Sequence, residues 1–343
     1  MISRYPVTKI AIKACQAIGR ILIHCWALAG ATLLSCVLLY WVLGGLIPFL
    51  LLTFAATGIL YQLEDYLLFH PDLPPHSRLF VSLPSVFGLP YESIFTRSGD
   101  GTLIHLFLIM QPGDSSAKAP TLLFFHGNAG NVGHRLQNMV GLYQFLHCNI
   151  VMLEYRGYGL SQGTPTEEGI YMDARAALDF ISSRQDFNHK EIILFGRSLG
   201  GAVAIDLSCN FLYSQKIWCL IIENSFTSIP DMARILLGWK ILRKLPLICY
   251  KSKFMSKNKI SQVNVPTLFV SGLSDSLVPS RMMKELYNLC SSKHKKLLEF
   301  PTGTHNETWT CQGYYNGLDA FIREARLKRM QSYSQLKGFV ESN

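Results

Sequence analysis

The sequence predicts an α/β fold, with a mostly parallel central sheet and helices on both faces, behind an N-terminal transmembrane anchor. Two observations lead to this prediction. Residues 21–63 contain no Asp, Glu, Lys or Arg, although charged residues make up 16% of the chain. After this stretch, short apolar runs bounded by turn residues alternate with amphipathic segments. That alternation is typical of buried parallel strands connected by helices.

The uncharged stretch is long enough to cross a membrane. About 20 apolar residues span the hydrocarbon core. The stretch therefore allows one helix with an apolar flank, or a hairpin of two helices broken near Gly44, Gly45 and Pro48. The charged residues that precede it are all basic, and the acidic residues Glu64 and Asp65 follow it. The positive-inside rule therefore places the N-terminus in the cytosol. We favour a single pass, which predicts a type II membrane protein with a lumenal or extracellular domain. A hairpin would return the domain to the cytosol.

The domain boundaries follow from changes in composition. We expect a basic cytosolic segment at 1–20, the anchor at 21–63, a linker at 64–90, the α/β domain at 91–328 and a tail at 329–343. Within the domain, residues 225–266 form a long connection that predicts a lid over the sheet. Its basic residues alternate with leucines. This pattern fits either a surface that rests on anionic lipid or admits acyl chains, or an ordinary solvated surface.

The strands and helices can be assigned in order. Residues 92–97 and 102–110, separated by the turn Ser98–Gly101, predict a β-hairpin. Six apolar runs predict the remaining strands: 121–125, 150–155, 191–195, 218–223, 267–271 and 296–300. Amphipathic segments predict helices at 167–184, 199–209, 279–289 and 313–326. An antiparallel start followed by βαβ units is the plan of the α/β-hydrolase fold.

A serine nucleophile is predicted at Ser198. The string Gly196-Arg197-Ser198-Leu199-Gly200 follows an apolar strand and precedes a helix-compatible run, so it is a G-x-S-x-G motif in strand–turn–helix context. Gly196 and Gly200 are expected because larger side chains would collide around the sharp turn of this nucleophile elbow.

A serine at its ordinary pKa needs a base. In this fold the order is Ser, then Asp or Glu, then His. Asp275 and His305 both follow predicted strands, at the edge of a parallel sheet where sites form. Glu223 is the alternative acid, and Asp275 could instead cap a helix before Pro279. His126 and His134 are rival bases, but they precede the serine.

The oxyanion of an acyl-transfer intermediate needs preorganised N–H donors. The backbone N–H of Leu199, which follows the nucleophile, is one candidate. The second is the N–H of Asn128, in the glycine-rich string His126-Gly127-Asn128-Ala129-Gly130-Asn131, with Ala129 as its alternative. This loop lacks the lysine and hydroxyl of a phosphate-binding P-loop.

Other classes of function find no support in the sequence. The six cysteines of the domain show no CxxC pair or zinc spacing, and we interpret them as buried thiols. The net charge of +9 comes mostly from the lid, and no nucleic-acid motif accompanies it. We therefore expect no metal, no cofactor and no nucleic-acid partner.

The motifs together resemble the Bem46-like α/β-hydrolases. The resemblance extends over roughly residues 75–328, through the strings around Asn128, Ser198, Asp275 and His305 and through Tyr155-Arg156-Gly157-Tyr158-Gly159. It implies a serine hydrolase with a triad on Ser198, Asp275 and His305, in a type II membrane protein. It also supports N-glycosylation of Asn306, in the sequon Asn306-Glu307-Thr308.

The resulting functional hypothesis is a membrane-anchored serine hydrolase that cleaves an acyl ester, thioester or lipid through an acyl-enzyme. The resemblance does not supply the substrate, and protein thioesters enter only by analogy with other hydrolases of this fold. A prolyl-oligopeptidase-like peptidase is one alternative, although the additional large domain of such peptidases is not seen in this sequence. A non-catalytic hydrolase-like scaffold is the other alternative.

Overall fold

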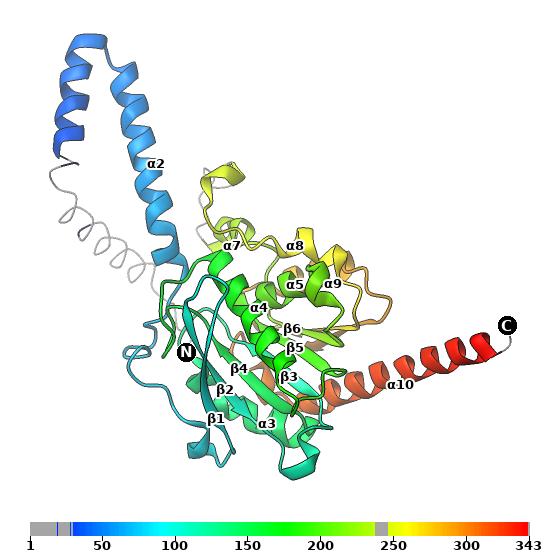
Figure 1. Cartoon of the computed structure of the whole chain (residues 1–343). Coiled ribbons are helices and arrows are strands. Elements are labelled where there is room, and N and C mark those ends of the chain that lie inside the picture. The colour runs from blue at the N-terminus through cyan, green and yellow to red at the C-terminus, as the bar shows by residue number, and fades with distance from the viewer. Residues whose placement is uncertain (1–18, 20–27, 29, 237–245, 342–343) are drawn as a thin grey trace. The chain divides into compact units, whose positions relative to one another are not determined.

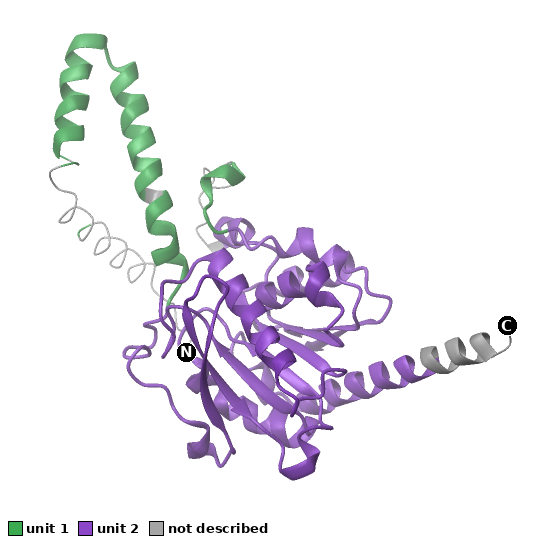
Figure 2. Ribbon diagram, in the orientation of Figure 1, with its two compact units in different colours: residues 1–70, 244–252 green, residues 71–243, 253–343 purple. Residues whose placement is uncertain are grey.

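The computed structural model describes residues 19, 28, 30–236 and 246–341. The chain divides into two compact units (Figure 2). Unit 1 comprises residues 1–70 and 244–252, and unit 2 comprises residues 71–243 and 253–343. The boundary at Pro71 assigns most of the expected linker 64–90 to the larger unit. The expected lid contributes residues to both units.

Unit 1 contains two apolar helices that are separated at Gly44 and Gly45. The first spans Gly30–Leu43 and the second, α2, spans Leu46–Leu68. Gly44 has a φ of 72°, a conformation that glycine adopts without strain. Among the described residues, α2 is the helix long and apolar enough to cross a membrane. Its 23 residues correspond to roughly 34 Å of helix.

The end of α2 binds the second segment of unit 1. The two carboxylate oxygens of Glu64 accept hydrogen bonds from the backbone N–H groups of Lys251 and Ser252, at 2.7 and 2.9 Å. Asp65 forms an ion pair with the Lys251 ammonium and accepts a hydrogen bond from the Ser252 hydroxyl. The acidic pair that follows the uncharged stretch therefore holds part of the connection between 225 and 266.

Unit 2 contains an eight-stranded sheet in the order β1-β2-β4-β3-β5-β6-β7-β8 (Figure 1). Strands β1 (Glu92–Arg97) and β2 (Leu103–Ile109) form an antiparallel hairpin, and β2 also pairs antiparallel with β4. The remaining pairings are parallel, through the strands β3 (Thr121–Phe125), β4 (Asn149–Glu154), β5 (Ile192–Arg197), β6 (Cys219–Glu223), β7 (Thr267–Gly272) and β8 (Lys295–Phe300). The predicted strands are confirmed to within one or two residues at their ends.

Two layers of helices cover the sheet (Figure 1). Helices α3 (Leu136–Leu146) and α10 (Tyr314–Glu341) pack together against one face. Helices α4 (Glu167–Ser183), α5 (Leu199–Cys209) and α9 (Ser280–Leu289) lie on the other. The main apolar core lies under α3 and α10, where alternate strand residues such as Phe124, Phe195 and Ile221 are buried. Alternation arises because successive side chains of a strand point to opposite faces.

Helix α3 is not among the helices that the sequence predicts, and Gly141 lowers its intrinsic helix propensity. A Cβ on Gly141 would lie 2.2 Å from the ring of Tyr315 in α10. The glycine is therefore required where the two helices approach each other, and packing overrides the local preference. Helix α10 continues through residue 328, where the sequence placed the end of the domain.

The described part of the lid is built from short elements. Helix α7 spans Ile229–Leu236, a 3-10 helix spans Leu247–Cys249, and α8 spans Ser256–Lys259. A second 3-10 helix spans Ile260–Gln262, and lid residues 237–245 lie outside the described part of the chain. Each domain cysteine is a free thiol. Cys148, Cys219 and Cys290 are buried as expected, whereas Cys209, Cys249 and Cys311 are only partly buried.

Candidate active site

Ser198 lies on a strained turn between β5 and α5. Its φ of 55° and ψ of −117° are unusual for a residue with a side chain. The turn is held by backbone contacts: Ser198 N–H donates to Glu223 O at 2.8 Å, and Gly201 N–H donates to Ser198 O at 2.9 Å. This geometry presents the serine hydroxyl at the carboxyl end of the sheet.

The glycines on both sides of Ser198 have a steric cause. A Cβ on Gly196 would lie 2.1 Å from the carbonyl oxygen of Gly200. A Cβ on Gly200 would lie 2.0 Å from the carbonyl oxygen of Phe125. Neither backbone oxygen can move without shifting a strand or a helix, so both positions require glycine.

The structure brings Asp275 and His305 to Ser198. His305 Nε2 lies 3.0 Å from Ser198 Oγ, and His305 Nδ1 lies 2.7 Å from Asp275 Oδ2. The His305 side chain is 12% exposed and that of Asp275 is 1% exposed. A tautomer with the proton on Nδ1 donates to Asp275 and leaves Nε2 to accept the serine proton.

The second oxygen of Asp275 has a separate role. Asp275 Oδ1 accepts hydrogen bonds from the backbone N–H groups of Leu277 and Val278, at 2.8 and 2.9 Å. These bonds hold the carboxylate plane while Oδ2 faces the histidine. Asp275 therefore caps the backbone before Pro279 with one oxygen and contacts His305 with the other, so the two roles that the sequence offers for Asp275 are compatible.

The alternative acid, Glu223, is occupied elsewhere. Its Oε1 lies 2.7 Å from Arg197 Nε, and its Oε2 accepts a hydrogen bond from the Tyr314 hydroxyl. Burial by itself lowers the pKa of Arg197, but the Glu223 and Tyr314 partners outweigh it, so the pKa is raised. The Arg197–Glu223 pair stabilises the base of the elbow rather than orienting His305.

The rival histidines belong to the loop after β3. His126 is fully buried, 3.3 Å from Glu154 Oε1. His134 Nδ1 accepts the backbone N–H of Asn131 at 3.1 Å. Burial lowers the pKa of His134, with the Arg135 charge as the next cause. Both imidazoles are therefore part of the loop's internal support.

The loop after β3 lies against the nucleophile. A Cβ on Gly127 would be 3.5 Å from the Cβ of Ser198, an ordinary van der Waals distance, so the backbone of Gly127 lies beside the serine. Three donors hold the loop: Tyr155 Oη to His126 O at 2.9 Å, Tyr158 Oη to Asn128 Oδ1 at 2.9 Å, and Arg135 Nη2 to Ala129 O at 2.6 Å. Sequence reasoning gave no role to these three donors, although two of them lie in the string around Arg156.

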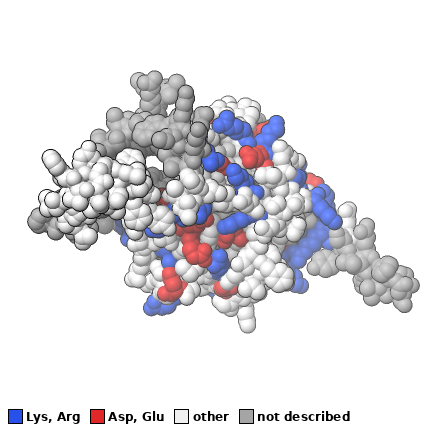
Figure 3. Space-filling model, turned by 90° about the horizontal axis from the view of Figure 1, so that it is seen from above, with Lys and Arg blue, Asp and Glu red and all other residues white. Residues whose placement is uncertain are grey.

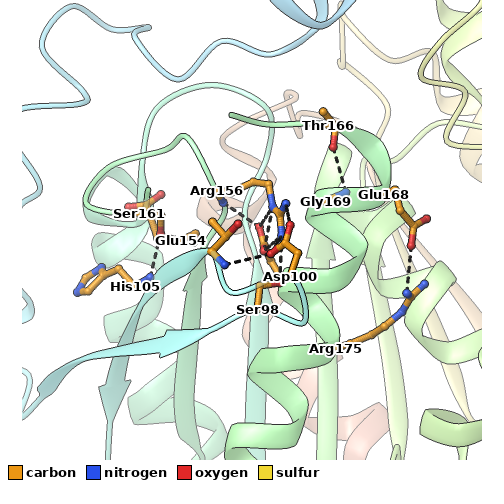
Figure 4. A network of polar contacts seen from close by, with 12 residues as sticks. Ser98, Asp100, His105, Glu154, Arg156, Ser161, Thr166, Glu168, Gly169 and Arg175 are labelled. Atoms are coloured by element: carbon orange, nitrogen blue, oxygen red, sulfur yellow. Dashed lines mark hydrogen bonds and ion pairs between the residues drawn. The ribbon is translucent and has the colours of Figure 1, made fainter. Parts of the chain in front are cut away.

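The Arg156 guanidinium anchors that string (Figure 4). It donates to Asp173 at 2.8 Å and to Asp100 at 2.6 Å, and it also contacts the Ser98 hydroxyl. The Arg156 hydrogen bond is the main cause that lowers the pKa of Asp100, whereas burial raises the pKa of Asp173. This network connects the β1–β2 turn, α4 and the loop after β4 that supports Asn128.

Most of the basic lid residues that the structure describes form ion pairs. Lys257 and Arg234 contact Asp231 at 2.7 and 3.0 Å, and Lys259 contacts Asp206 at 2.6 Å. Lys240, Arg243 and Lys244 lie outside the described residues. In Figure 3, positive and negative side chains are interspersed with uncharged surface. The described pairs favour an ordinary solvated surface over an anionic-lipid contact.

A cavity of about 260 Å³ lies between α7, α8 and α9. Its charged lining residues are Asp231, Arg234, Lys257, Arg281 and Glu285. None of the three candidate catalytic residues lines it, and its charges make it a poor match for an acyl chain. Among the residues that the structure describes, there is also no cluster of three metal-ligating side chains.

The predicted glycosylation site lies on the loop of His305. Asn306 is exposed, and its carbonyl accepts a hydrogen bond from Trp309 Nε1 at 2.9 Å. Thr308 is buried, and its hydroxyl donates to Thr304 O at 2.7 Å. Threonine at the third position of the sequon therefore has a structural role that does not depend on a glycan.

Known proteins share this architecture and sequence. A family model described as alpha/beta hydrolase fold matches residues 120–245, and one described as serine hydrolase (FSH1) matches residues 197–306. The Pyrococcus furiosus esterase Pf2001 superposes with a TM-score of 0.57 at 18% identity, covering 73% of this chain and 95% of the esterase. The superposition and the family models show the α/β-hydrolase fold.

Curated relatives extend over most of the chain. "Alpha/beta hydrolase domain-containing protein WAV2" from Arabidopsis thaliana is 40% identical over 76% of this chain and 86% of its own length. "Protein bem46" from Schizosaccharomyces pombe is 37% identical over 80% of this chain and 91% of its own length. A relative from Saccharomyces cerevisiae, named an uncharacterized membrane protein, is 31% identical over 82% of this chain and 95% of its own length. The chain therefore belongs to the Bem46-like family of α/β-hydrolase domain proteins.

Proposed function

We propose that this protein is a serine hydrolase that cleaves an acyl ester or thioester with Ser198, His305 and Asp275. The observation that carries the proposal is the continuous line of contacts from Ser198 Oγ through His305 to Asp275, at 3.0 and 2.7 Å. The esterase title of a structural neighbour supports an ester substrate. The thioester rests on the chemistry of the nucleophile alone.

The proposed reaction has two half-reactions. Ser198 Oγ attacks the acyl carbon while its proton passes to His305 Nε2, and Asp275 stabilises the imidazolium. His305 then gives this proton to the leaving oxygen or sulfur, and the acyl group remains on Ser198. A water molecule attacks the acyl-enzyme while His305 accepts a proton from it. His305 then returns this proton to Ser198 Oγ as the bond between Oγ and the acyl carbon breaks, and the carboxylic acid is released.

The backbone N–H groups of Leu199 and Asn128 are the proposed oxyanion donors. Leu199 is the first residue of α5, so its N–H lies at a helix N-terminus, where the helix dipole favours negative charge. The contact between Gly127 and Ser198 supports the assignment of Asn128, because it brings the loop beside the nucleophile.

The proposed location is a membrane, with α2 as the anchor and the catalytic unit lumenal or extracellular. Support comes from the length and composition of α2 and from the yeast relative that is named a membrane protein. Residues 91–328 remain the proposed catalytic domain. The hairpin alternative, with a cytosolic domain, also agrees with the helix break at Gly44 and Gly45.

A fluorophosphonate probe tests the proposed function, because it reacts only with an activated serine. We expect wild type to be labelled and Ser198→Ala to be unlabelled. Ser208→Ala is the matched control, since Ser208 lies on the same helix and donates to Ala204 O. Wild-type protein that is folded but unlabelled would exclude the enzyme and support the scaffold alternative.

A further inference from the structure

We propose that Asn224 is the positioning residue that fixes the backbone of His305 relative to the loop of Asp275; this inference rests on the proposed hydrolase function. Asn224 directly follows β6 and is 1% exposed. Its φ is 46°, a left-handed conformation that asparagine tolerates better than most residues. Its own N–H donates to Val270 O at 3.0 Å.

The Asn224 side chain connects two loops. Its Oδ1 accepts the backbone N–H of Gly272 at 2.8 Å, at the end of β7 and three residues before Asp275. Its Nδ2 faces the backbone oxygens of Thr304 and His305, both at 3.1 Å. These partners fix the orientation of the Asn224 side-chain amide, because its oxygen must face the Gly272 N–H and its nitrogen must face the carbonyl groups.

Thr308 completes this cluster on the histidine side. Asn224 Nδ2 lies 2.9 Å from Thr308 Oγ1, which itself donates to Thr304 O. The glycines of the two loops are in contact: a Cβ on Gly272 would lie 2.5 Å from Gly303 O, and Ser274 N–H donates to Gly303 O at 3.0 Å. Asn224 therefore lies where the end of β7, which leads to Asp275, meets the loop that carries His305.

The consequence for catalysis is geometric. His305 must keep Nε2 near Ser198 and Nδ1 near Asp275 at once, and it lies in the loop between β8 and the 3-10 helix Thr308–Thr310. A shift of about 1 Å in such a group can reduce a rate by roughly 100-fold. Without the Asn224 amide, two carbonyl groups and one N–H would lose a buried partner, and the histidine loop would keep fewer contacts, such as those of Thr308 and Ser274.

Two substitutions separate the hydrogen bonds from backbone strain. Asn224→Asp keeps the shape, the tolerance of positive φ and the acceptor for Gly272 N–H, but it loses the donors to Thr304 and His305. Asn224→Gly keeps the backbone conformation without strain and removes the whole side chain. Asn264→Asp is the matched control, because Asn264 is exposed in the loop before β7.

The experiment compares the second-order rate of fluorophosphonate labelling, its pH profile, and the downfield proton resonance of the His305–Asp275 hydrogen bond, at a temperature where each variant is folded. We expect both Asn224 variants to be labelled roughly 10- to 100-fold more slowly, with a weakened or shifted resonance, whereas Asn264→Asp behaves as wild type. Wild-type rates and an unchanged resonance in folded Asn224 variants would overturn the positioning role. An unlabelled wild type would instead overturn the proposed function, so the two failures are distinguishable.

Discussion

Arg197 and Glu223 form an ion pair next to Ser198, the proposed nucleophile, with side chains that are 2% and 0% exposed and a distance of 2.7 Å between Nε and Oε1. The two residues end neighbouring parallel strands and pair in register. Because Arg197 precedes Ser198, the pair ties the strained turn to the next strand.

The first prediction concerns this pair. Glu223→Gln leaves the Arg197 charge buried without its counter-charge, and we expect a loss of roughly 3–5 kcal/mol in the free energy of unfolding. Chemical denaturation measures the change. Asp179→Asn is the control: it removes an exposed ion pair with Lys216 and should cost less than about 1 kcal/mol. Equal stability of Glu223→Gln and wild type would show that the pair does not hold the elbow.

The second prediction tests the packing of the elbow. Gly200→Ala places a Cβ 2.0 Å from the carbonyl oxygen of Phe125, so we expect a loss of at least about 3 kcal/mol in the free energy of unfolding, or no folded protein. Gly99→Ala is the control, because a Cβ there meets no atom within 4 Å. A folded and normally labelled Gly200→Ala protein would contradict the close approach of Gly200 to the end of β3.

The third prediction concerns the loop after β3, which carries the proposed oxyanion donor Asn128. Tyr158→Phe removes the donor to Asn128 Oδ1, and Asn128→Ala removes the acceptor but keeps the backbone N–H. We expect each variant to lose activity by roughly 3- to 10-fold, and the double variant to lose no more, because both remove one contact. A double-mutant cycle of labelling rates measures this coupling. Loss of more than about 1,000-fold in Asn128→Ala would mean that the side chain, rather than the backbone, contacts the oxyanion.

The fourth prediction is a pH dependence of stability. Burial lowers the pKa of His105 from 6.5 to about 4, so this residue gains a proton on unfolding between these pH values. Its contribution to stability is therefore present above pH 6.5 and decreases as the pH falls. The slope contributed by one such group is at most about 1.4 kcal/mol per pH unit.

Replacing His105 tests that slope. His105→Gln should flatten the dependence of unfolding free energy on pH between 6.5 and 4, whatever its effect on stability at neutral pH. Above this window the curves of variant and wild type should run parallel. Identical slopes inside the window would show that His105 is not the responsible group.

The fifth prediction concerns membrane topology. If the catalytic unit is lumenal, endoglycosidase treatment should increase the gel mobility of wild type but not of Asn306→Gln, because glycans are added only in the lumen. Thr308→Ser keeps the sequon and should behave as wild type. A lack of any shift in wild type and Thr308→Ser would favour the hairpin with a cytosolic domain.

Much of the fold could be predicted because its signals are local. The apolar runs at 121–125 and 267–271 became β3 and β7 with almost unchanged bounds. Helix α3 was missed because Gly141 is explained only by Tyr315 of α10, which is distant in sequence. The composition of residues 64–90 predicts a linker. In the structure, however, the Asn131 side chain holds part of this segment by donating hydrogen bonds to Ser77 O and Phe80 O.

By itself, the sequence predicted the candidate nucleophile Ser198 and determined the glycines around it, because a sharp strand–turn–helix junction restricts residue size within a few positions. Only the tertiary structure decided which acid faces His305. Glu223 ends β6 and Asp275 follows β7, so both lie at the carboxyl ends of parallel strands. They differ because Arg197 and Tyr314 bind the carboxylate of Glu223. The hydrogen bonds of Tyr158 to Asn128 and of Asn224 to Gly272 could not be predicted from the sequence either, since each joins segments that meet only when the sheet has formed.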